Sequence, residues 1–395
     1  MTSRFIASYP DLAEVCGEFC RQEWIALDTE FMRERTYYAK LCLVQIGTPH
    51  EIVCVDPLAI DDLTPLVDLL CNQGVLKVMH AARQDMEVFH DLWRTRRASA
   101  DAGESVGPVP GPVFDTQVAA GYLGYEDQIG YAALVKSITG TDLDKSHTRT
   151  DWSSRPLSPE QRRYAEDDVR YLRDVYVALA KALETAGRSH WPLQDFARLS
   201  DPSLYESSPD DAWQRVRNVQ QLDVRARRAL RQLAAWRERA ARSSDLPRSW
   251  VVSDSALLDL ARRRPSDSAT LGAVGGLTQR AVHRWGAGIL EAIAAADRPG
   301  VQEMRPPRQM LDADQTEIYR RMAAEVDRVA REIGISSALL APRRDVQRLV
   351  LGERDLALLT GWRRELVGEN LIALLAQVPA ADKPAPAGSL AGVRF

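Results

Sequence analysis

Two apolar runs separated by a single turn constrain the fold of this chain more than any other feature. Lys40–Gly47 (KLCLVQIG) and Glu51–Asp56 (EIVCVD) each have the length of a buried strand, and Thr48-Pro49-His50 between them is a turn signal. Strands this close in sequence are expected to pair antiparallel. A third apolar run, Trp24–Leu27, precedes them and ends at Asp28. Together these runs predict a sheet near the start of the chain.

Helical patterns surround the strands and predict an α/β domain, which we take to cover residues 1–195. Ser158-Pro159-Glu160-Gln161 places Ser at an N-cap, Pro at the first helical position and Gln at the third, which predicts a helix running to about Thr185. The other elements expected are helices at Leu63–Leu70 and Ala81–Arg96, a strand at Val75–Met79 and an exposed loop at Ala98–Pro112.

The rest of the chain predicts two helical domains. Residues 211–294 and 311–378 share a long helix, an apolar-Pro-Arg element and a final helix, which indicates a degenerate duplication of a unit of about 80 residues. The corresponding apolar-Pro-Arg elements are Leu246-Pro247-Arg248 and Ala341-Pro342-Arg343. We expect linkers at 196–210 and 295–310, and a disordered tail at 379–395.

Charge separates the parts of the chain. The formal net charge is −4, yet residues 211–291 hold fifteen arginines and no lysine against eight acids, so the remainder is strongly acidic. This asymmetry fits a carboxylate-rich catalytic module joined to a module that binds phosphate, and it fits a solvated helical face equally well. The tryptophans of this stretch are expected in the core rather than as stacking platforms: Trp213, Trp236, Trp250 and Trp285.

Other features of the sequence exclude several classes of protein. No run of eighteen apolar residues occurs and Met1–Phe5 has no leader pattern, so we expect no membrane span and a cytoplasmic location. Five cysteines without a CxxC pair favour reduced, buried thiols over disulfides or a zinc site. We expect the protein to act as a monomer.

Four acidic residues and a tyrosine carry the chemistry that the sequence predicts. Asp28 and Glu30, two apart at a strand end, project from one face of that strand. Asp85 lies early in the helix that follows the next predicted strand. Tyr164 and Asp168 lie one turn apart on one helical face. Each pattern alone is common by chance, but their order along the chain indicates a convergent carboxylate site.

These motifs resemble those of a known nuclease family. Asp28-Thr29-Glu30, His80–Asp85 (HAARQD) and Tyr164–Asp168 (YAEDD) resemble the three exonuclease motifs of the DEDD superfamily, in its tyrosine subclass. The two C-terminal segments resemble the helicase-and-ribonuclease-D C-terminal domain. The resemblance spans roughly residues 1–378, although Ala82-Arg83-Gln84 departs from the small residue and acid expected beside Asp85. Further segments that resemble the ribonuclease D family are Phe31–Tyr38, Asp115-Thr116-Gln117, Leu143–Ser146 and Arg149–Trp152.

The resemblance implies an α/β ribonuclease-H-like exonuclease domain, with a mixed central sheet flanked by helices, followed by two all-α helical-bundle domains. It implies hydrolytic 3′→5′ exoribonuclease activity that releases nucleoside 5′-monophosphates and trims tRNA precursors and other small structured RNAs. Asp28, Glu30, Asp85 and Asp168 would be catalytic ligands of two Mg²⁺ or Mn²⁺ ions, hard cations that prefer oxygen and stabilise the attacking and leaving oxygens. Tyr164 would orient the attacking water, because a phenol is a poor base near neutrality.

Candidate nucleic-acid contacts flank the motifs. Phe31 or Met32 could stack on the terminal base, although a core role fits the pattern as well. His80 follows a strand, where histidines are more often structural than ligands. Lys145 and Arg149, in a polar loop before the catalytic helix, could hold phosphates or face solvent. The full set of candidates is Thr29, Phe31, Met32, His80, Lys145 and Arg149.

Three other functions remain open from the sequence. A 3′→5′ DNA exonuclease of the same superfamily would share the motifs, because nothing in them separates ribose from deoxyribose. A non-catalytic nucleic-acid-binding adaptor would keep the basic helices, but all five motif residues are present. A purely structural helical scaffold would leave the carboxylate set unexplained.

Overall fold

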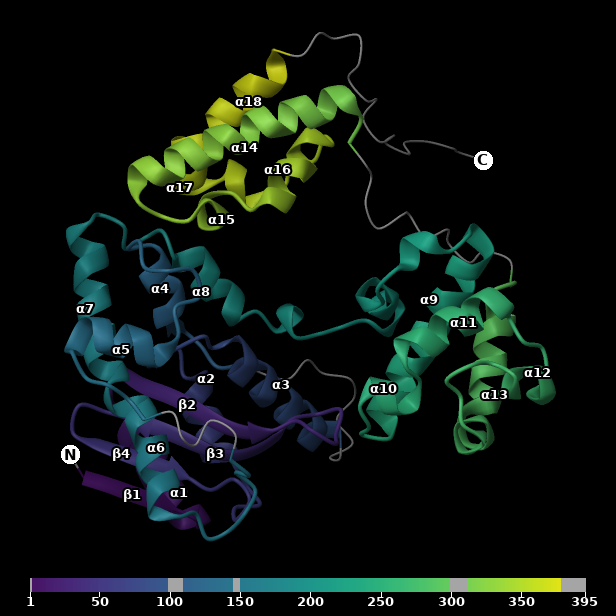
Figure 1. Cartoon of the computed structure of the whole chain (residues 1–395). Helices are drawn as coiled ribbons and strands as arrows, with labels where there is room; N and C mark the ends of the chain where they lie inside the picture. Colours follow the sequence, from purple (N-terminus) through teal and green to yellow (C-terminus); the bar gives the residue numbers. More distant parts are fainter. Residues whose placement is uncertain (1, 99–108, 145–149, 299–310, 378–395) are drawn as a thin grey trace, which may run out of the picture. The chain divides into compact units, whose positions relative to one another are not determined.

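The computed structural model of this chain describes residues 2–98, 109–144, 150–298 and 311–377 (Figure 1). The predicted tail, Lys145, Arg149 and most of the predicted 98–112 loop lie outside these ranges. The chain forms two compact units that each draw on separate segments. Unit 1 comprises residues 1–113, 144–173 and 197–309, and unit 2 comprises residues 114–143, 174–196 and 310–395.

Six strands of the described chain form one mixed sheet in the order β1-β4-β3-β2-β5-β6. β3 pairs antiparallel with both β2 and β4, as predicted for the two apolar runs, whereas β1–β4 and β2–β5 are parallel. The strands are β1 (Thr2–Ile6), β2 (Trp24–Met32), β3 (Lys40–Gly47), β4 (Glu51–Val55), β5 (Leu76–Met79) and β6 (Val113–Asp115). The mixed sheet confirms the predicted α/β class.

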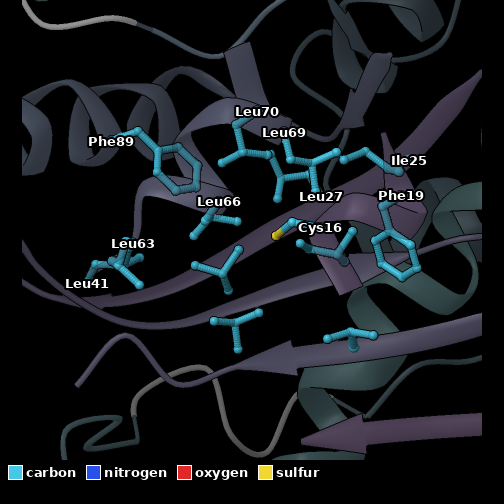
Figure 2. Packing of buried hydrophobic residues seen from close by; sticks show 14 of the residues in the cluster. Cys16, Phe19, Ile25, Leu27, Leu41, Leu63, Leu66, Leu69, Leu70 and Phe89 are labelled. Atoms are coloured by element: carbon cyan, nitrogen blue, oxygen red, sulfur yellow. The ribbon is translucent and has the colours of Figure 1, made fainter. Parts of the chain in front are cut away.

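One face of the sheet is covered by α1 (Tyr9–Phe19), α2 (Thr64–Cys71) and α3 (Arg83–Ala98). Alternate residues of the central strands point into this core, among them Leu27 of β2 and Ile46 of β3. Figure 2 shows Leu27 among Phe19, Leu66 and Leu69 of the helices. Leu27 is fully buried, so its truncation to Ala is expected to cost about 2–5 kcal/mol of stability.

The opposite face of the sheet carries α6 (Pro159–Arg170), which packs on β2, β3 and β4. A small hydrophobic cluster, called here the cluster beneath α6, packs against this helix and comprises Cys42, Leu43, Cys54, Trp152, Leu157 and Ala165. Gly47 lets the helix approach, because a Cβ there would lie 3.3 Å from the Val169 Cβ. The predicted capping box is present at Ser158 and Gln161. The predicted helix is shorter than expected, however, since α6 ends at Arg170 and α7 (Leu172–Thr185) follows separately.

Two expectations about the strands are corrected. β1 has no counterpart in the prediction, because TSRFI is a polar edge strand whose pairing with β4 is set by a distant segment. The predicted run Trp24–Leu27 is the first half of β2, which continues to Met32 through pairing with β3. Asp28 and Glu30 therefore lie inside the second strand of the chain rather than at the end of the first.

The basic stretch of unit 1 folds into a helical domain, the α9–α13 domain, around its own core. Its helices are α9 (Val224–Ser243), α10 (Arg248–Val251), α11 (Asp254–Arg263), α12 (Ser268–Gly272) and α13 (Gln279–Ala295). Trp213 is buried, and Trp236 and Trp285 pack against the core. Trp250 contradicts the core expectation, because it is 58% exposed on a short helix whose inward position belongs to Val251.

Unit 2 is all helical apart from the end of β6, and its C-terminal part repeats the proline feature of the α9–α13 domain: Pro247 caps α10 and Pro342 caps α16. Its aromatic centre stacks Trp191 on Trp362 at 4.5 Å, beside the buried Tyr122. Its helices are α4 (Thr116–Gly121), α5 (Tyr131–Thr139), most of α7, the first half of α8 (Leu193–Leu199), α14 (Ala313–Ile333), α15 (Ser337–Leu340), α16 (Arg343–Val350), α17 (Gly361–Arg363) and α18 (Glu369–Ala376).

Two predictions about composition can be compared with the described residues. None of their helices combines the length and the apolar character that a membrane crossing requires. All five cysteines are free thiols; Cys16, Cys42 and Cys54 are buried as predicted, whereas Cys20 and Cys71 are only half-buried.

Candidate active site

The sheet face beneath α6 brings the first two predicted carboxylates together. Asp28 lies opposite Gln45 of β3 and Glu30 lies opposite Leu43, so both side chains leave the same face of β2. β5 pairs with β2 only from Trp24 to Ala26. Both carboxylates therefore lie where β5 has ended, on a stretch of β2 that keeps only β3 as a partner.

Helix α6 supplies the third carboxylate and the tyrosine. Carboxylate oxygens of Asp28, Glu30 and Asp168 all lie within 4.8 Å of one another, and the three side chains are half-buried. Tyr164 lies one helical turn before Asp168, and its ring centroid is 5.9 Å from that of Trp152. Tyr164 also packs against the hydrophobic residues between α6 and the sheet.

Asp85 reaches the same region from the other side of β2. It lies in the first turn of α3 and is buried, and the Thr29 hydroxyl donates a hydrogen bond to its Oδ1. The turn between β5 and α3 contains Ala81 with a φ of 55°, a left-handed conformation that an alanine rarely adopts. We attribute this local strain to the turn that brings the start of α3 to the end of β5.

The carboxylates of Asp28, Glu30 and Asp168 are like charges held close together. Burial and the charges of Asp168, Asp85 and Glu30 raise the pKa of Asp28 well above its ordinary value. Burial and the charges of Asp168 and Asp85 raise the pKa of Glu30 to about 9. Burial and the charge of Asp167 raise the pKa of Asp168 to about 7. The chain alone therefore does not hold this cluster fully ionised near neutral pH.

A divalent cation fits this arrangement. Among the described residues, no lysine or arginine forms an ion pair with Asp28, Glu30 or Asp168. Half-buried carboxylates that repel one another are the oxygen ligands that Mg²⁺ and Mn²⁺ prefer. These three residues can hold such an ion, and Asp85 lies close enough for its charge to raise the pKa of Glu30.

The predicted nucleic-acid contacts fall into different environments. Met32 packs beside Tyr164 against the cluster beneath α6, whereas Phe31 packs against the main core on the other face, so a core role accounts for Phe31. Thr29 is buried and orients Asp85 through its hydroxyl. His80 is half-buried at the end of β5. Contact of any of them with nucleic acid stays a prediction.

Gln45 is a site residue that the sequence reasoning missed. It is fully buried on β3 directly opposite Asp28, and neither its amide nitrogen nor its amide oxygen has a hydrogen-bond partner within the described protein. A buried amide is expensive without partners. The available signal was a glutamine inside the otherwise apolar run KLCLVQIG.

Comparison with known proteins shows which families this chain is similar to. Residues 4–184 match the 3′-5′ exonuclease family and residues 226–293 match the HRDC domain family. The ribonuclease D of Gluconacetobacter diazotrophicus is 40% identical over 380 residues, which cover 93% of this chain and 92% of that protein. The ribonuclease D of Sphingobium indicum is 39% identical over 372 residues, covering 92% of each. The crystal structure of Escherichia coli RNase D, described as an exoribonuclease involved in structured RNA processing, is similar with a TM-score of 0.83 at 32% identity, covering 96% of this chain and 100% of that one.

Proposed function

Because this chain belongs to the ribonuclease D family of 3′→5′ exoribonucleases, we propose that it hydrolyses RNA from the 3′ end with two divalent cations and releases nucleoside 5′-monophosphates. The observation that carries the proposal is the cluster of Asp28, Glu30 and Asp168, whose oxygens lie within 4.8 Å of one another without a cation from the described chain. The relatives' names, and the structured-RNA processing attributed to the Escherichia coli enzyme, support tRNA precursors and small structured RNAs as the substrate class.

The proposed roles follow from the placement of each group. Asp28, Glu30, Asp85 and Asp168 hold the cations. Bound there, two Mg²⁺ or Mn²⁺ ions would supply positive charge to the attacking and leaving oxygens of the phosphodiester. Tyr164 lies one turn from Asp168, and its hydroxyl would orient the attacking water. Thr29 keeps the Asp85 carboxylate in position.

We also propose a division of labour along the chain. Residues 1–195 form the catalytic domain, 211–294 a helical domain that binds nucleic acid, and 311–378 a second, degenerate helical domain, joined by the linkers 196–210 and 295–310. Several arginines of the α9–α13 domain form ion pairs within that domain, such as Arg237 with Asp254. Arginines that are exposed and have no partner among the described residues supply the phosphate contacts: Arg217, Arg225, Arg239 and Arg280.

The deciding experiment incubates purified protein with a 3′-tailed RNA hairpin, with Mg²⁺, with Mn²⁺ and with excess chelator. We expect a ladder shortened from the 3′ end, 5′-monophosphate products, and loss of both in chelator. Asp28→Asn should lose activity, whereas Glu14→Gln, which removes a charge from the exposed side of α1, should keep it. Chelator-resistant degradation or 3′-phosphate products would refute the proposed mechanism.

A second substrate separates RNA from DNA specificity. A matched oligonucleotide with one 2′-deoxy residue at its 3′ end keeps the scissile geometry and removes a single hydroxyl. We expect slower removal of that residue than of its ribose counterpart. Equal rates of removal for the 2′-deoxy residue and its ribose counterpart, together with equally fast degradation of an all-DNA strand, would favour the DNA exonuclease instead.

A further inference from the structure

The loop between β2 and β3 is held by residues outside the proposed catalytic domain. Residues 33–39 join β2, which carries Asp28 and Glu30, to β3. At the far end of this loop, the backbone N–H groups of Tyr37 and Tyr38 both donate to the Asp245 Oδ1, each at 3.0 Å. Asp245 follows α9, so one side chain of the α9–α13 domain fixes two consecutive peptide groups of the loop.

The Tyr37 side chain continues into the same domain. Its hydroxyl donates to the Glu238 carboxylate and accepts from the Arg248 guanidinium at 2.9 Å and from Arg242 at 3.1 Å. The Arg248 guanidinium also lies 4.8 Å from the centre of the Tyr37 ring. The ring packs against the core of the α9–α13 domain, although it belongs to the β2–β3 loop.

The near end of the loop contacts α3, the helix that carries Asp85. Arg33 pairs with Glu87 at 2.7 Å, and Glu87 lies two residues after Asp85. The β2–β3 register shifts between Glu30 and Phe31, so the strand pair is irregular directly after a metal-ligand candidate and shortly before the loop begins at Arg33. The backbone around Met32 is therefore braced on one side by the strand pair and on the other by the contacts at Tyr37.

From these contacts we infer that Tyr37 and Asp245 are positioning residues, through which the α9–α13 domain holds the β2–β3 loop in the shape that admits the 3′ end of the substrate. This inference rests on the proposed exonuclease function for its kinetic consequence. The anchoring itself does not, since it concerns the order of a loop. It also gives the helical domain a second task besides binding RNA.

Asp245 permits a matched set of variants. Its φ is 47°, a conformation that asparagine and glycine adopt much more readily than alanine. Asp245→Gly removes the acceptor of the two amide groups and keeps the backbone conformation available. Asp245→Asn keeps an oxygen acceptor and the same conformation, so it is the conservative control.

The first readout is limited trypsin digestion of the native full-length protein, followed by intact mass. Arg33 and Arg35 are exposed in the loop, and their cleavage requires the loop to open. We expect Asp245→Gly to accelerate cleavage there about tenfold, because two hydrogen bonds to a charged acceptor hold the closed loop. Asp245→Asn should be cleaved about as slowly as the unaltered protein.

The second readout is the kinetics of hydrolysis of a single-stranded RNA. The RNA is too short to reach the arginines proposed to bind phosphate, namely Arg217, Arg225, Arg239 and Arg280. We expect Asp245→Gly to raise KM about tenfold and to change kcat by no more than about twofold, because entry of the substrate is disturbed while the metal ligands stay in place. Unchanged cleavage at Arg33 and Arg35, or faster cleavage with unchanged KM, would overturn the inference. If the unaltered protein has no exonuclease activity, the proposed function is refuted, but the trypsin comparison remains valid.

If Asp245→Gly loses its cooperative thermal transition, Tyr37→Phe decides by the same two readouts. It keeps the ring and its packing and removes the hydroxyl that Glu238 and two arginines share. We expect a smaller change in the same direction in both readouts, and no change in either would overturn the inference.

Discussion

Two carboxylates in unit 1, the half-buried Glu30 and the buried Glu238, have opposite surroundings. Glu30 faces other carboxylates, and burial with their charges raises its pKa to about 9. Burial alone would also raise the pKa of Glu238, but hydrogen bonds from Arg248 and Tyr37 and the charges of Arg248 and Arg242 outweigh it and lower the pKa to about 2. The chain thus provides cations where a carboxylate is structural. Where it provides none, the compensating charge is expected to come from bound metal.

The largest effect should follow from removing a ligand of the uncompensated cluster. Asp28→Asn is expected to lower turnover by roughly 10³-fold or more, since several kcal/mol of charge stabilisation in the transition state is lost. Single-turnover rates in Mg²⁺, with Glu14→Gln as the charge-matched control, measure it. Near-normal turnover by Asp28→Asn would end the assignment of Asp28 as a metal ligand.

Tyr164→Phe should have the next largest effect on rate. We expect the chemical step to slow by about 10²-fold with unchanged metal affinity, because only a positioning hydroxyl is removed. Tyr9→Phe, which alters an exposed tyrosine at the start of α1, is the matched control. A loss of metal affinity with a normal single-turnover rate at saturating metal would reverse the role given to Tyr164.

Glu238→Gln should act on stability, in contrast to Asp28→Asn. It leaves Arg242 and Arg248 facing each other without their shared anion, so we expect a loss of about 3 kcal/mol in the free energy of unfolding. Chemical denaturation against Glu291→Gln, an exposed acid of α13, measures the difference. A loss no larger than that of Glu291→Gln would show that the arginines are satisfied without Glu238.

A further prediction concerns the pH dependence of stability, whose sign differs between the two carboxylates. The raised pKa values of Glu30 and Asp168 mean that folding without metal takes up protons, so stability falls as pH rises from about 5 to 9. Glu238 contributes nothing to this window, because its stabilisation is complete above its unfolded pKa and is lost only as pH falls toward 2. Thermal melts of chelated protein between pH 5 and 9 test this, and Asp28→Asn should flatten the decline.

The local patterns of the sequence foretold much of this geometry. The capping box at Ser158 located the start of α6, and the helical spacing put Tyr164 and Asp168 one turn apart on it. Motif order predicted that Asp168 converges with Asp28 and Glu30, as it does. These signals are local, because they depend on strand alternation and helical periodicity.

Features that depend on distant segments could not be predicted in this way. The pairing of β1 with β4 and the contact of Tyr37 with Glu238 join residues far apart in sequence, and no periodicity encodes them. Trp250 is exposed although tryptophans usually pack inward, because α10 is too short to bury more than Val251. Such features follow from the assembled fold.

The most direct test of the account is calorimetric titration of Mn²⁺ into the chelator-stripped protein near pH 7.5, in two buffers of different ionisation enthalpy. If the cluster of Asp28, Glu30 and Asp168 is the metal site, binding must displace protons held at their raised pKa values, so the apparent enthalpy will depend on the buffer. Asp28→Asn should weaken the binding and reduce the proton release, whereas Glu14→Gln should change neither. Binding without proton release, or binding of equal affinity by Asp28→Asn, would contradict the central claim that this cluster is left without internal cations in order to hold metal.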